Sequence, residues 1–191
     1  NCLVYLVDHG GVGTFRLRET EVLTVADLAA WLDTLQQSIT GTLTVVIDCC
    51  NSGSLMPSLR APAGYEDKRI VITSAQADED AYFVSSGAIS FSNYFWTQVF
   101  NGASVGEAFD AGYNAMHVSF NFQTPLLDGD GNGIGNEPDD GAFAGAVYIG
   151  NGARQYWEGP AIDSVSPGQT IVDTATATLW ADGVTDLDGV A

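Results

Sequence analysis

The chain has 191 residues, of which 46% are hydrophobic, so it can bury one core of ordinary size and is not disordered by composition. It carries 24 acidic and 6 basic residues, a formal net charge of −18 at pH 7, which argues against nucleic-acid binding because a phosphate backbone requires a basic face. No apolar run reaches the length of a membrane helix, and the three cysteines, two of them adjacent, match neither a disulfide framework nor the spacing of a zinc site.

The beginning of the chain predicts a strand–helix–strand unit. Residues 2–7 ("CLVYLV") are apolar throughout, which is typical of a strand buried on both faces. After a glycine-rich turn, the capping-box-like pair Thr24 and Asp27 opens a predicted helix over 24–38 with apolar residues at helical spacing. Residues 42–48 ("TLTVVID") predict a second buried strand. This order indicates a parallel sheet with a right-handed crossover.

The α/β pattern continues through the middle of the chain. A third buried strand is predicted over 68–75, and the aromatic residues of 90–100 lie on one helical face. A second capping pattern opens a helix over 104–118, and the apolar run over 144–150 predicts a further strand.

A change in composition near residue 160 predicts a domain boundary. From 160 to 191 the sequence is threonine-rich, with short alternating apolar runs and no helix signal. We therefore expect an α/β domain over 1–159 and the start of a β-sandwich-like accessory module over 160–191. Because the chain opens inside a strand and stops abruptly, we expect a piece of a longer protein that lacks the first strands of its sheet and any targeting signal.

Chemically notable residues follow two of the predicted strands. The first strand runs into "DHGG" and the second into "CCNSGS", and one strand–helix–strand unit brings these two ends to the same edge of the sheet. His9 is therefore expected near the cysteine pair. An imidazole beside a thiol can favour the thiolate and protonate a leaving amine, and the amides of Gly10 and Cys50 can hold an oxyanion. The pattern favours acyl transfer over the alternative of a structural histidine and an inert thiol.

Strand alternation separates the two cysteines. Cys49 is still in register with the strand and is expected to point into the packing layer as a small apolar residue. Cys50, one position later, is expected to face the cleft. Cys50 is therefore the favoured nucleophile.

The stretch "VYLVDHGG" followed by "VVIDCCNSGS" resembles the caspase-like cysteine peptidases of clan CD, and most closely the legumain family. The resemblance covers about residues 2–150. It implies a caspase-like three-layer α/β sandwich with a mostly parallel central sheet and a dyad of Cys50 and His9. It also implies that Gly10 contributes to the oxyanion hole. The sequence departs from the legumain pattern at Asn51, where legumains carry Glu.

The resemblance also implies which residues select the substrate. Asp48, two positions before the nucleophile, corresponds to an acidic residue that lines the S1 pocket. Metacaspases carry Asp there and favour Arg or Lys at P1, whereas legumains favour Asn. The stretch from "ITSAQADEDAYF" to "GAISFSNYFW" resembles the far wall of S1, which makes Ser74, Ser90 and Ser92 candidate wall residues. A carboxylate that caps a turn is the open alternative for Asp48.

A glycine- and aspartate-rich stretch over 128–141 ("DGDGNGIGNEPDDG") predicts a calcium-binding loop outside an EF-hand. Asp128, Asp130, Asn132 and Asp139 fall at positions 1, 3, 5 and 12 of an EF-hand-type loop. A solvated acidic turn is the open alternative, because turns also favour Asp, Asn and Gly.

Together these patterns predict a bacterial-type cysteine endopeptidase, secreted or at the cell surface, that cleaves peptides or proteins through a thioester on Cys50. P1 is expected to be Arg, Lys or Asn. No cofactor is expected in catalysis, and calcium is expected only in a structural role. Two alternatives stay open: a catalytically inactive interaction module of a surface protein, and a peptide ligase or transpeptidase that shares the acyl-enzyme.

Overall fold

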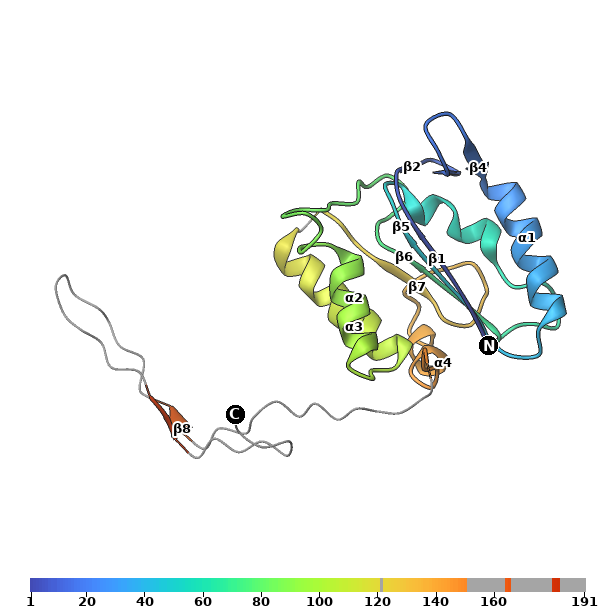
Figure 1. Ribbon diagram of the computed structural model, residues 1–191. Coiled ribbons are helices and arrows are strands. Elements are labelled where there is room, and N and C mark those ends of the chain that lie inside the picture. Colours follow the sequence, from blue (N-terminus) through green and yellow to red (C-terminus); the bar gives the residue numbers. More distant parts are fainter. Residues whose placement is uncertain (121, 151–163, 166–179, 183–191) are drawn as a thin grey trace. The chain divides into compact units, whose positions relative to one another are not determined.

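The computed structural model describes residues 1–120, 122–150, 164–165 and 180–182 (Figure 1). Contacts divide the chain into two units, Asn1–Arg154 and Gln155–Ala191. In the second unit, strand β8 (Ser164–Val165) pairs antiparallel with strand β9 (Ala181–Asp182). Most of the predicted β-sandwich-like module lies outside the described residues, so its architecture and its boundary stay predictions.

A four-stranded sheet in the order β1-β5-β6-β7 forms the centre of the first unit. Strands β1 (Cys2–Val7), β5 (Leu43–Asp48) and β6 (Arg69–Thr73) run parallel, and β7 (Leu126–Asp128) pairs antiparallel with β6. All residues of β5 and β6 are buried, as their continuous apolar runs predict. The mostly parallel central sheet that the sequence predicts is confirmed.

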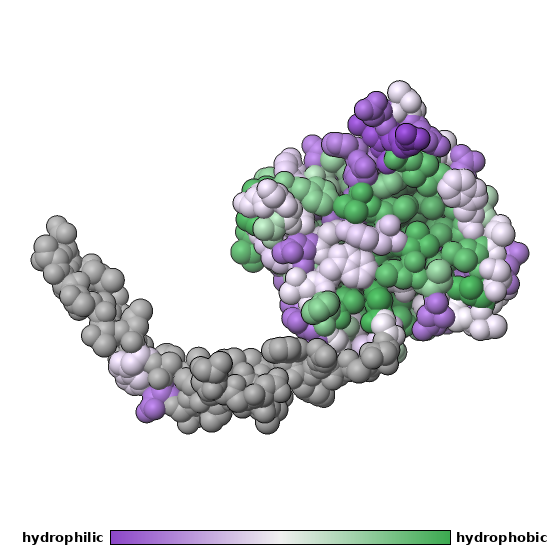
Figure 2. All heavy atoms as spheres, viewed as in Figure 1, coloured by the Kyte–Doolittle hydropathy of each residue, from purple (hydrophilic) through white to green (hydrophobic). Residues whose placement is uncertain are grey.

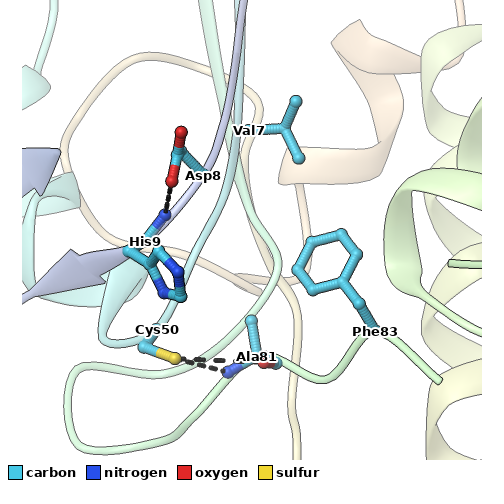
Figure 3. Close-up of a pocket in the computed structure, with 6 residues that line it drawn as sticks. All are labelled: Val7, Asp8, His9, Cys50, Ala81 and Phe83. Carbon is cyan, nitrogen blue, oxygen red and sulfur yellow. Dashed lines mark hydrogen bonds between the residues drawn. The ribbon is translucent and has the colours of Figure 1, made fainter. Parts of the chain in front are cut away.

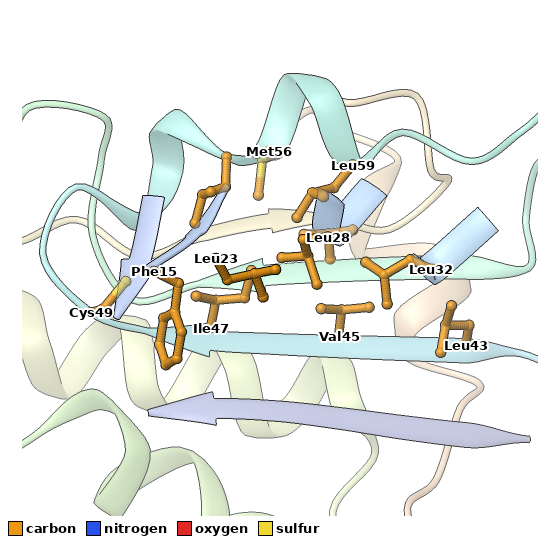
Figure 4. Packing of buried hydrophobic residues seen from close by; sticks show 12 residues of the cluster. Phe15, Leu23, Leu28, Leu32, Leu43, Val45, Ile47, Cys49, Met56 and Leu59 are labelled. Atoms are coloured by element: carbon orange, nitrogen blue, oxygen red, sulfur yellow. The ribbon is translucent and has the colours of Figure 1, made fainter. Parts of the chain in front are cut away.

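Helix α1 (Val25–Ser38) covers one face of this sheet together with the 3-10 helix η2 (Met56–Leu59) (Figure 1). The hydroxyl of Thr24 caps α1 by accepting a hydrogen bond from the Asp27 amide at 3.2 Å. The core on this face includes Leu28, Leu32, Val45, Ile47, Cys49 and Leu59 (Figure 4).

Helices α2 (Phe91–Phe100) and α3 (Val105–Ser119) cover the other face of the sheet (Figure 1). Ser104 and Glu107 form the predicted capping box at the start of α3. The second core includes Val46, Ile70, Ile72, Phe91, Phe95 and Phe109. Because alternate residues of β5 enter opposite cores, the unit has three layers, as predicted.

Strand β1 differs from its prediction, because it is not buried on both faces. Leu3, Tyr5 and Val7 are 38–43% exposed, while the side chains between them pack against the core on the α1 side. Among the described strands, β1 lies at the edge of the sheet, where α2 covers its outer face only in part: the rings of Tyr5 and Trp96 pack edge to face with their centroids 5.0 Å apart. Figure 2 shows hydrophobic residues gathered on the face along which β1 runs.

A small antiparallel sheet follows β1 directly. It is formed by β2 (Gly10–Gly11), β3 (Thr14–Arg16) and β4 (Val22–Thr24) in sequence order. Phe15 and Leu23 from this sheet are buried in the core on the α1 side. This packing fixes the path of the chain immediately after His9.

The strand predicted over 144–150 is wrong. Helix α4 (Asp140–Ala144) ends where that strand would begin, and turns and bends follow it. Within this stretch the Val147 carbonyl accepts a hydrogen bond from the Val105 amide at 2.8 Å, at the start of α3. A short apolar run alone does not separate a strand from a segment packed against a helix. No helix in the described part of the chain is long and apolar enough to cross a membrane.

Candidate active site

The carboxyl ends of β1 and β5 meet at one edge of the central sheet. Val7 lies opposite Asp48 in the parallel register, so His9 and Cys50 emerge from neighbouring strands. A cavity of about 440 Å³ opens between them, and it is lined by Val7, Asp8, His9, Cys50, Ala81 and Phe83 (Figure 3). The structure thus brings the predicted dyad into one cavity, while the catalytic roles of the two residues stay a prediction.

The two adjacent thiols lie in different surroundings. Cys49 is fully buried in the core on the α1 side (Figure 4), and burial, with the nearby Asp48 carboxylate, raises its pKa to about 12. Cys50 is half-buried and faces the cavity. This placement agrees with the expected strand alternation. Because the thiolate is the reactive form, Cys49 is unsuited to act as a nucleophile near neutral pH.

Gly10 allows the segment after β1 to approach the cysteines. A Cβ at this position would overlap the Cys49 Sγ and lie 2.6 Å from the Cys50 carbonyl oxygen. Only glycine therefore fits here without moving backbone or core. Gly10 fixes the distance between the two strand ends, and with it the position of His9 over the nucleophile.

The chain turns sharply after Cys50. Asn51 adopts a left-handed conformation with φ of 57°, and the 3-10 helix η1 (Ser52–Ser54) follows. The Ser52 hydroxyl accepts a hydrogen bond from the Ala75 amide at 3.1 Å, and the Gly53 amide donates to the Ala75 carbonyl at 2.9 Å. The "NSGS" sequence thus anchors the turn to the end of β6 and leaves Cys50 at the cavity.

Ala81 and Phe83 also line the cavity, although neither was predicted as a site residue. The Ala81 amide lies 3.4 Å from the Cys50 Sγ, and its carbonyl oxygen lies 3.9 Å from the same sulfur. Phe83 is 44% exposed and forms an apolar wall with Val7. Both residues lie in the stretch "ITSAQADEDAYF", whose resemblance to the far wall of S1 indicates the segment but not which of its residues line the cavity.

The four predicted substrate-binding residues do not line this cavity. Asp48 is 1% exposed, and its carboxylate accepts hydrogen bonds from the Ser92 hydroxyl at 2.5 Å and from the Ser92 amide at 3.1 Å. Tyr5 donates in turn to the Ser92 hydroxyl at 2.7 Å. Ser90 instead caps α2. Burial raises the pKa of Asp48, and the hydroxyls of Ser74 and Ser92 oppose that rise.

Two buried polar atoms remain beside this hydrogen-bonded group. The Oδ1 atom of Asp48 and the hydroxyl of Ser74 have no hydrogen-bond partner of ordinary geometry among the described residues. The Ser74 hydroxyl is nevertheless near enough to Asp48 to lower its pKa. Buried polar atoms rarely stay unpaired in a protein without a further role.

The model of the peptidase C13 family matches residues 1–116, which include both strand ends of the site. The chain belongs to the peptidase C13 family. The predicted resemblance to legumain-type, caspase-like peptidases is therefore confirmed at the level of the family. No curated protein matches the chain. The chain is also similar to a crystal structure of caspase-1 from Spodoptera frugiperda, with 13% identity and a TM-score of 0.49, over 66% of this chain and 58% of the caspase. The chain thus spans less than two thirds of that caspase chain.

In this member of the peptidase C13 family, three aspartates gather between the end of β7 and the start of α4. Carboxylate oxygens of Asp128, Asp130 and Asp140 lie within 4.8 Å of one another. Asp139, which the sequence places at position 12 of the loop, does not belong to this group. Asp139 is instead the residue that precedes α4. The carboxylate of the next residue, Asp140, accepts a hydrogen bond from the Gly129 amide at 2.7 Å.

Asp128 is the buried centre of this loop. Its carboxylate accepts hydrogen bonds from the amides of Gly131, Asn132 and Gly133 at 2.8–3.1 Å. Burial raises the pKa of Asp128 to about 6, against the lowering effect of the Gly133 and Gly131 amides, and Asp140 and Asp130 add to the rise. The Asn132 side chain donates to the carboxylates of Asp130 and Glu137, so it acts here as a hydrogen-bond donor between acidic groups.

Proposed function

We propose that the chain is a cysteine endopeptidase in which Cys50 is the nucleophile and His9 the general acid and base. Membership of the peptidase C13 family makes peptides or proteins the expected substrates. The observation that carries the proposal is that His9 and Cys50 line one cavity at the ends of adjacent parallel strands, while Cys49 is buried in the core.

The chemistry follows from this placement. The Cys50 thiol gives its proton to His9 as the sulfur attacks the carbonyl carbon of the scissile bond, and the π electrons move to the oxygen. His9 donates a proton to the leaving nitrogen as the C–N bond breaks, which leaves a thioester on Cys50. His9 then takes a proton from water, whose oxygen attacks the thioester, and the sulfur leaves as the acid product forms.

The backbone offers donors for the oxyanion. Arg16 donates to the His9 carbonyl at 2.9 Å, so the next cross-strand pair, Gly10 with Phe15, is of the non-hydrogen-bonded kind. The Gly10 amide therefore points away from β3 and is available to a substrate oxygen. With the Cys50 amide it would form a two-donor oxyanion hole.

Asp48 and Ser74 support the proposed recognition of a polar P1 side chain. The unpaired atoms of Asp48 and Ser74 can accept hydrogen bonds from a guanidinium, an ammonium or an amide, which fits P1 Arg, Lys or Asn. The other role open to Asp48 is to hold Ser92, at the start of α2, against β5. The Asp48→Asn variant separates the two roles. Selective loss of basic P1 peptides indicates recognition, whereas equal loss across all P1 residues indicates a structural tie.

The acidic loop supports a structural calcium site. Asp128, Asp130 and Asp140 supply the hard oxygen ligands that Ca²⁺ prefers, and the three amides on Asp128 leave part of its lone-pair capacity free. Calcium would neutralise three carboxylates that otherwise repel one another. Calcium supplies no step of the proposed reaction. A structural calcium site would suit the secreted or cell-surface location that we propose for the protein.

The test uses fluorogenic peptides with Arg, Lys, Asn or Gln at P1, with and without calcium, and the variants Cys50→Ala and His9→Ala. Cleavage that both variants abolish supports the proposal. Transfer of the acyl group to an added amine would identify a ligase or transpeptidase. No cleavage by the full-length protein, together with a Cys50 that does not react with thiol probes, would identify an inactive interaction module.

A further inference from the structure

The backbone of Ala81 brackets the sulfur of Cys50 (Figure 3). The Ala81 N–H donates to Sγ at 3.4 Å, and the Ala81 carbonyl oxygen is the acceptor for the thiol hydrogen at 3.9 Å. One residue is therefore placed to contact both protonation states of the sulfur. The carbonyl contacts the thiol, and the N–H contacts the thiolate.

The described residues that line the cavity provide no fixed positive charge for a thiolate. None of the six residues that line it is Lys or Arg. Asp8 and His9 line the cavity with Cys50, and Asp48 and Cys49 directly precede Cys50 in the chain. His9 and backbone N–H donors are therefore the groups among these residues that can contact a thiolate favourably.

We propose that the Ala81 N–H is a catalytic group that stabilises the Cys50 thiolate, and that Glu79 and Gln123 are positioning residues that hold it at the sulfur. The inference rests on the proposed role of Cys50 as nucleophile. A hydrogen bond to the charged form of a group favours that form, and it requires a donor whose position is fixed.

Glu79 fixes the segment on one side of Ala81. Its carboxylate accepts hydrogen bonds from the Thr124 amide at 2.6 Å, the Thr124 hydroxyl at 3.1 Å and the Gln76 amide at 3.0 Å. Its backbone carbonyl accepts from the Asn51 amide at 2.7 Å, one residue after the nucleophile. Glu79 therefore links the Cys50 turn, the segment that carries Ala81 and the approach to β7.

Gln123 fixes the segment on the other side. It is 2% exposed, its Oε1 accepts from the Tyr82 amide at 3.0 Å, and its Nε2 donates to the Ser74 carbonyl at 2.9 Å. The amides of residues 81 and 82 are thus both engaged, one by the sulfur and one by Gln123. Because Ser74 directly follows β6, Gln123 ties the Ala81 segment to the central sheet.

The first test compares Ala81→Pro, which lacks the N–H, with Ala81→Gly, which keeps it. The rate of iodoacetamide alkylation at Cys50 is followed against pH in the full chain by peptide mass spectrometry, and thermal unfolding confirms folding. We expect the midpoint of the alkylation profile to move to higher pH in Ala81→Pro, with about tenfold slower alkylation at pH 7. Ala81→Gly should keep the profile of the parent protein.

The second test uses two variants that keep every backbone N–H. It depends on the direction in which the midpoint of the alkylation profile moves. Glu79→Gln and Asp80→Asn each remove one negative charge from the same segment. On charge alone, both variants would move the midpoint to lower pH, because a like charge is removed. We expect Asp80→Asn to do so, whereas Glu79→Gln should move it to higher pH because the segment that holds the N–H loosens.

A folded Ala81→Pro variant with an unchanged profile, or a Glu79→Gln variant that follows Asp80→Asn, would overturn the inference. The alkylation profile does not depend on peptide cleavage. If the expected shifts occur without cleavage of any peptide, the thiolate donor stands and the proposed peptidase function fails. If cleavage is robust and the profiles do not move, the peptidase function stands and this inference fails.

Discussion

Cys49 and Cys50 are neighbours in the chain but contact different parts of the molecule. At the end of β5, alternation turns Cys49 into the core and Cys50 towards the cavity. A shift of one residue in register would exchange these two environments. Cys49 packs closely in its core position, where a Cβ at Gly10 would overlap its sulfur. Packing of Cys49 in the core on the α1 side therefore leaves Cys50 as the cysteine that faces the cavity.

The two cysteines can be separated by matched substitutions. We expect Cys50→Ala to abolish peptide cleavage and labelling by thiol probes. Cys49→Ala should retain both but lower the free energy of unfolding by about 1 kcal/mol, because it removes one buried sulfur atom. Peptide kinetics and urea denaturation measure these effects. Equal loss of cleavage in the two variants, with both proteins folded, would contradict the assignment.

Gly10 offers a second test at the scale of one residue. Gly10→Ala forces a methyl group against the Cys49 sulfur and the Cys50 carbonyl, so we expect a loss of about 2 kcal/mol in stability and at least about tenfold in kcat/KM. Gly11→Ala is the control, because its Cβ meets only the Thr14 hydroxyl, at 3.3 Å, and that side chain can move. Similar effects from both substitutions would show that the close approach at Gly10 is unimportant.

The sequence indicated the parts of the site that follow strands. Strand alternation and the strand–helix–strand order placed His9 and Cys50 together, because both rules depend only on local pattern. Ala81 could not be found in this way, since it acts through its backbone and its position depends on contacts with Glu79 and Gln123. The same limit applies to the acidic loop. The spacing of an EF-hand-type loop selected Asp139, whereas the carboxylates that lie together are those of Asp128, Asp130 and Asp140.

At the scale of elements, apolar periodicity was sufficient wherever an element is long and fully packed. It predicted β5, β6 and the three long helices within a few residues. It failed for β1, whose apolar run resembles a central strand although one face is exposed at the sheet edge. It also missed β7, because three residues that merge into the acidic loop show no period. Whether a strand lies at the edge depends on how the whole sheet is assembled, so the sequence of that strand alone does not reveal it.

The acidic loop gives a prediction at the scale of one element. We expect calcium to raise the melting temperature, because binding to the folded state alone stabilises it. Asp140→Asn should abolish this rise, whereas Asp139→Asn should preserve it, since only Asp140 lies in the carboxylate group. Differential scanning fluorimetry in EDTA and in calcium makes the comparison. A calcium effect lost in Asp139→Asn but kept in Asp140→Asn would support Asp139, the ligand predicted from sequence spacing, over Asp140.

At the scale of the whole molecule, negative charge is the dominant feature. The net charge is −18, and burial raises the pKa values of Asp48, Asp128 and Asp140 inside the folded unit. These carboxyls hold their protons more strongly in the folded than in the unfolded state. Their contribution to stability is therefore complete below their unfolded pKa values and is lost as pH rises through the folded ones.

We therefore expect the calcium-free protein to become more stable as pH falls from 8 towards 5, which is opposite to the usual effect of ion-paired carboxylates. For Asp128, a folded pKa of about 6 against an ordinary value of 3.8 gives a change of about 1.4 kcal/mol between pH 8 and pH 5, and weaker self-repulsion at lower pH acts in the same direction. Urea denaturation across this range in EDTA measures the trend. In calcium, we expect the loop to contribute less stability as pH falls, because protons and the ion compete for the same carboxylates. If stability fell steadily on acidification in EDTA, these carboxyls would have to be ionised and paired in the folded protein.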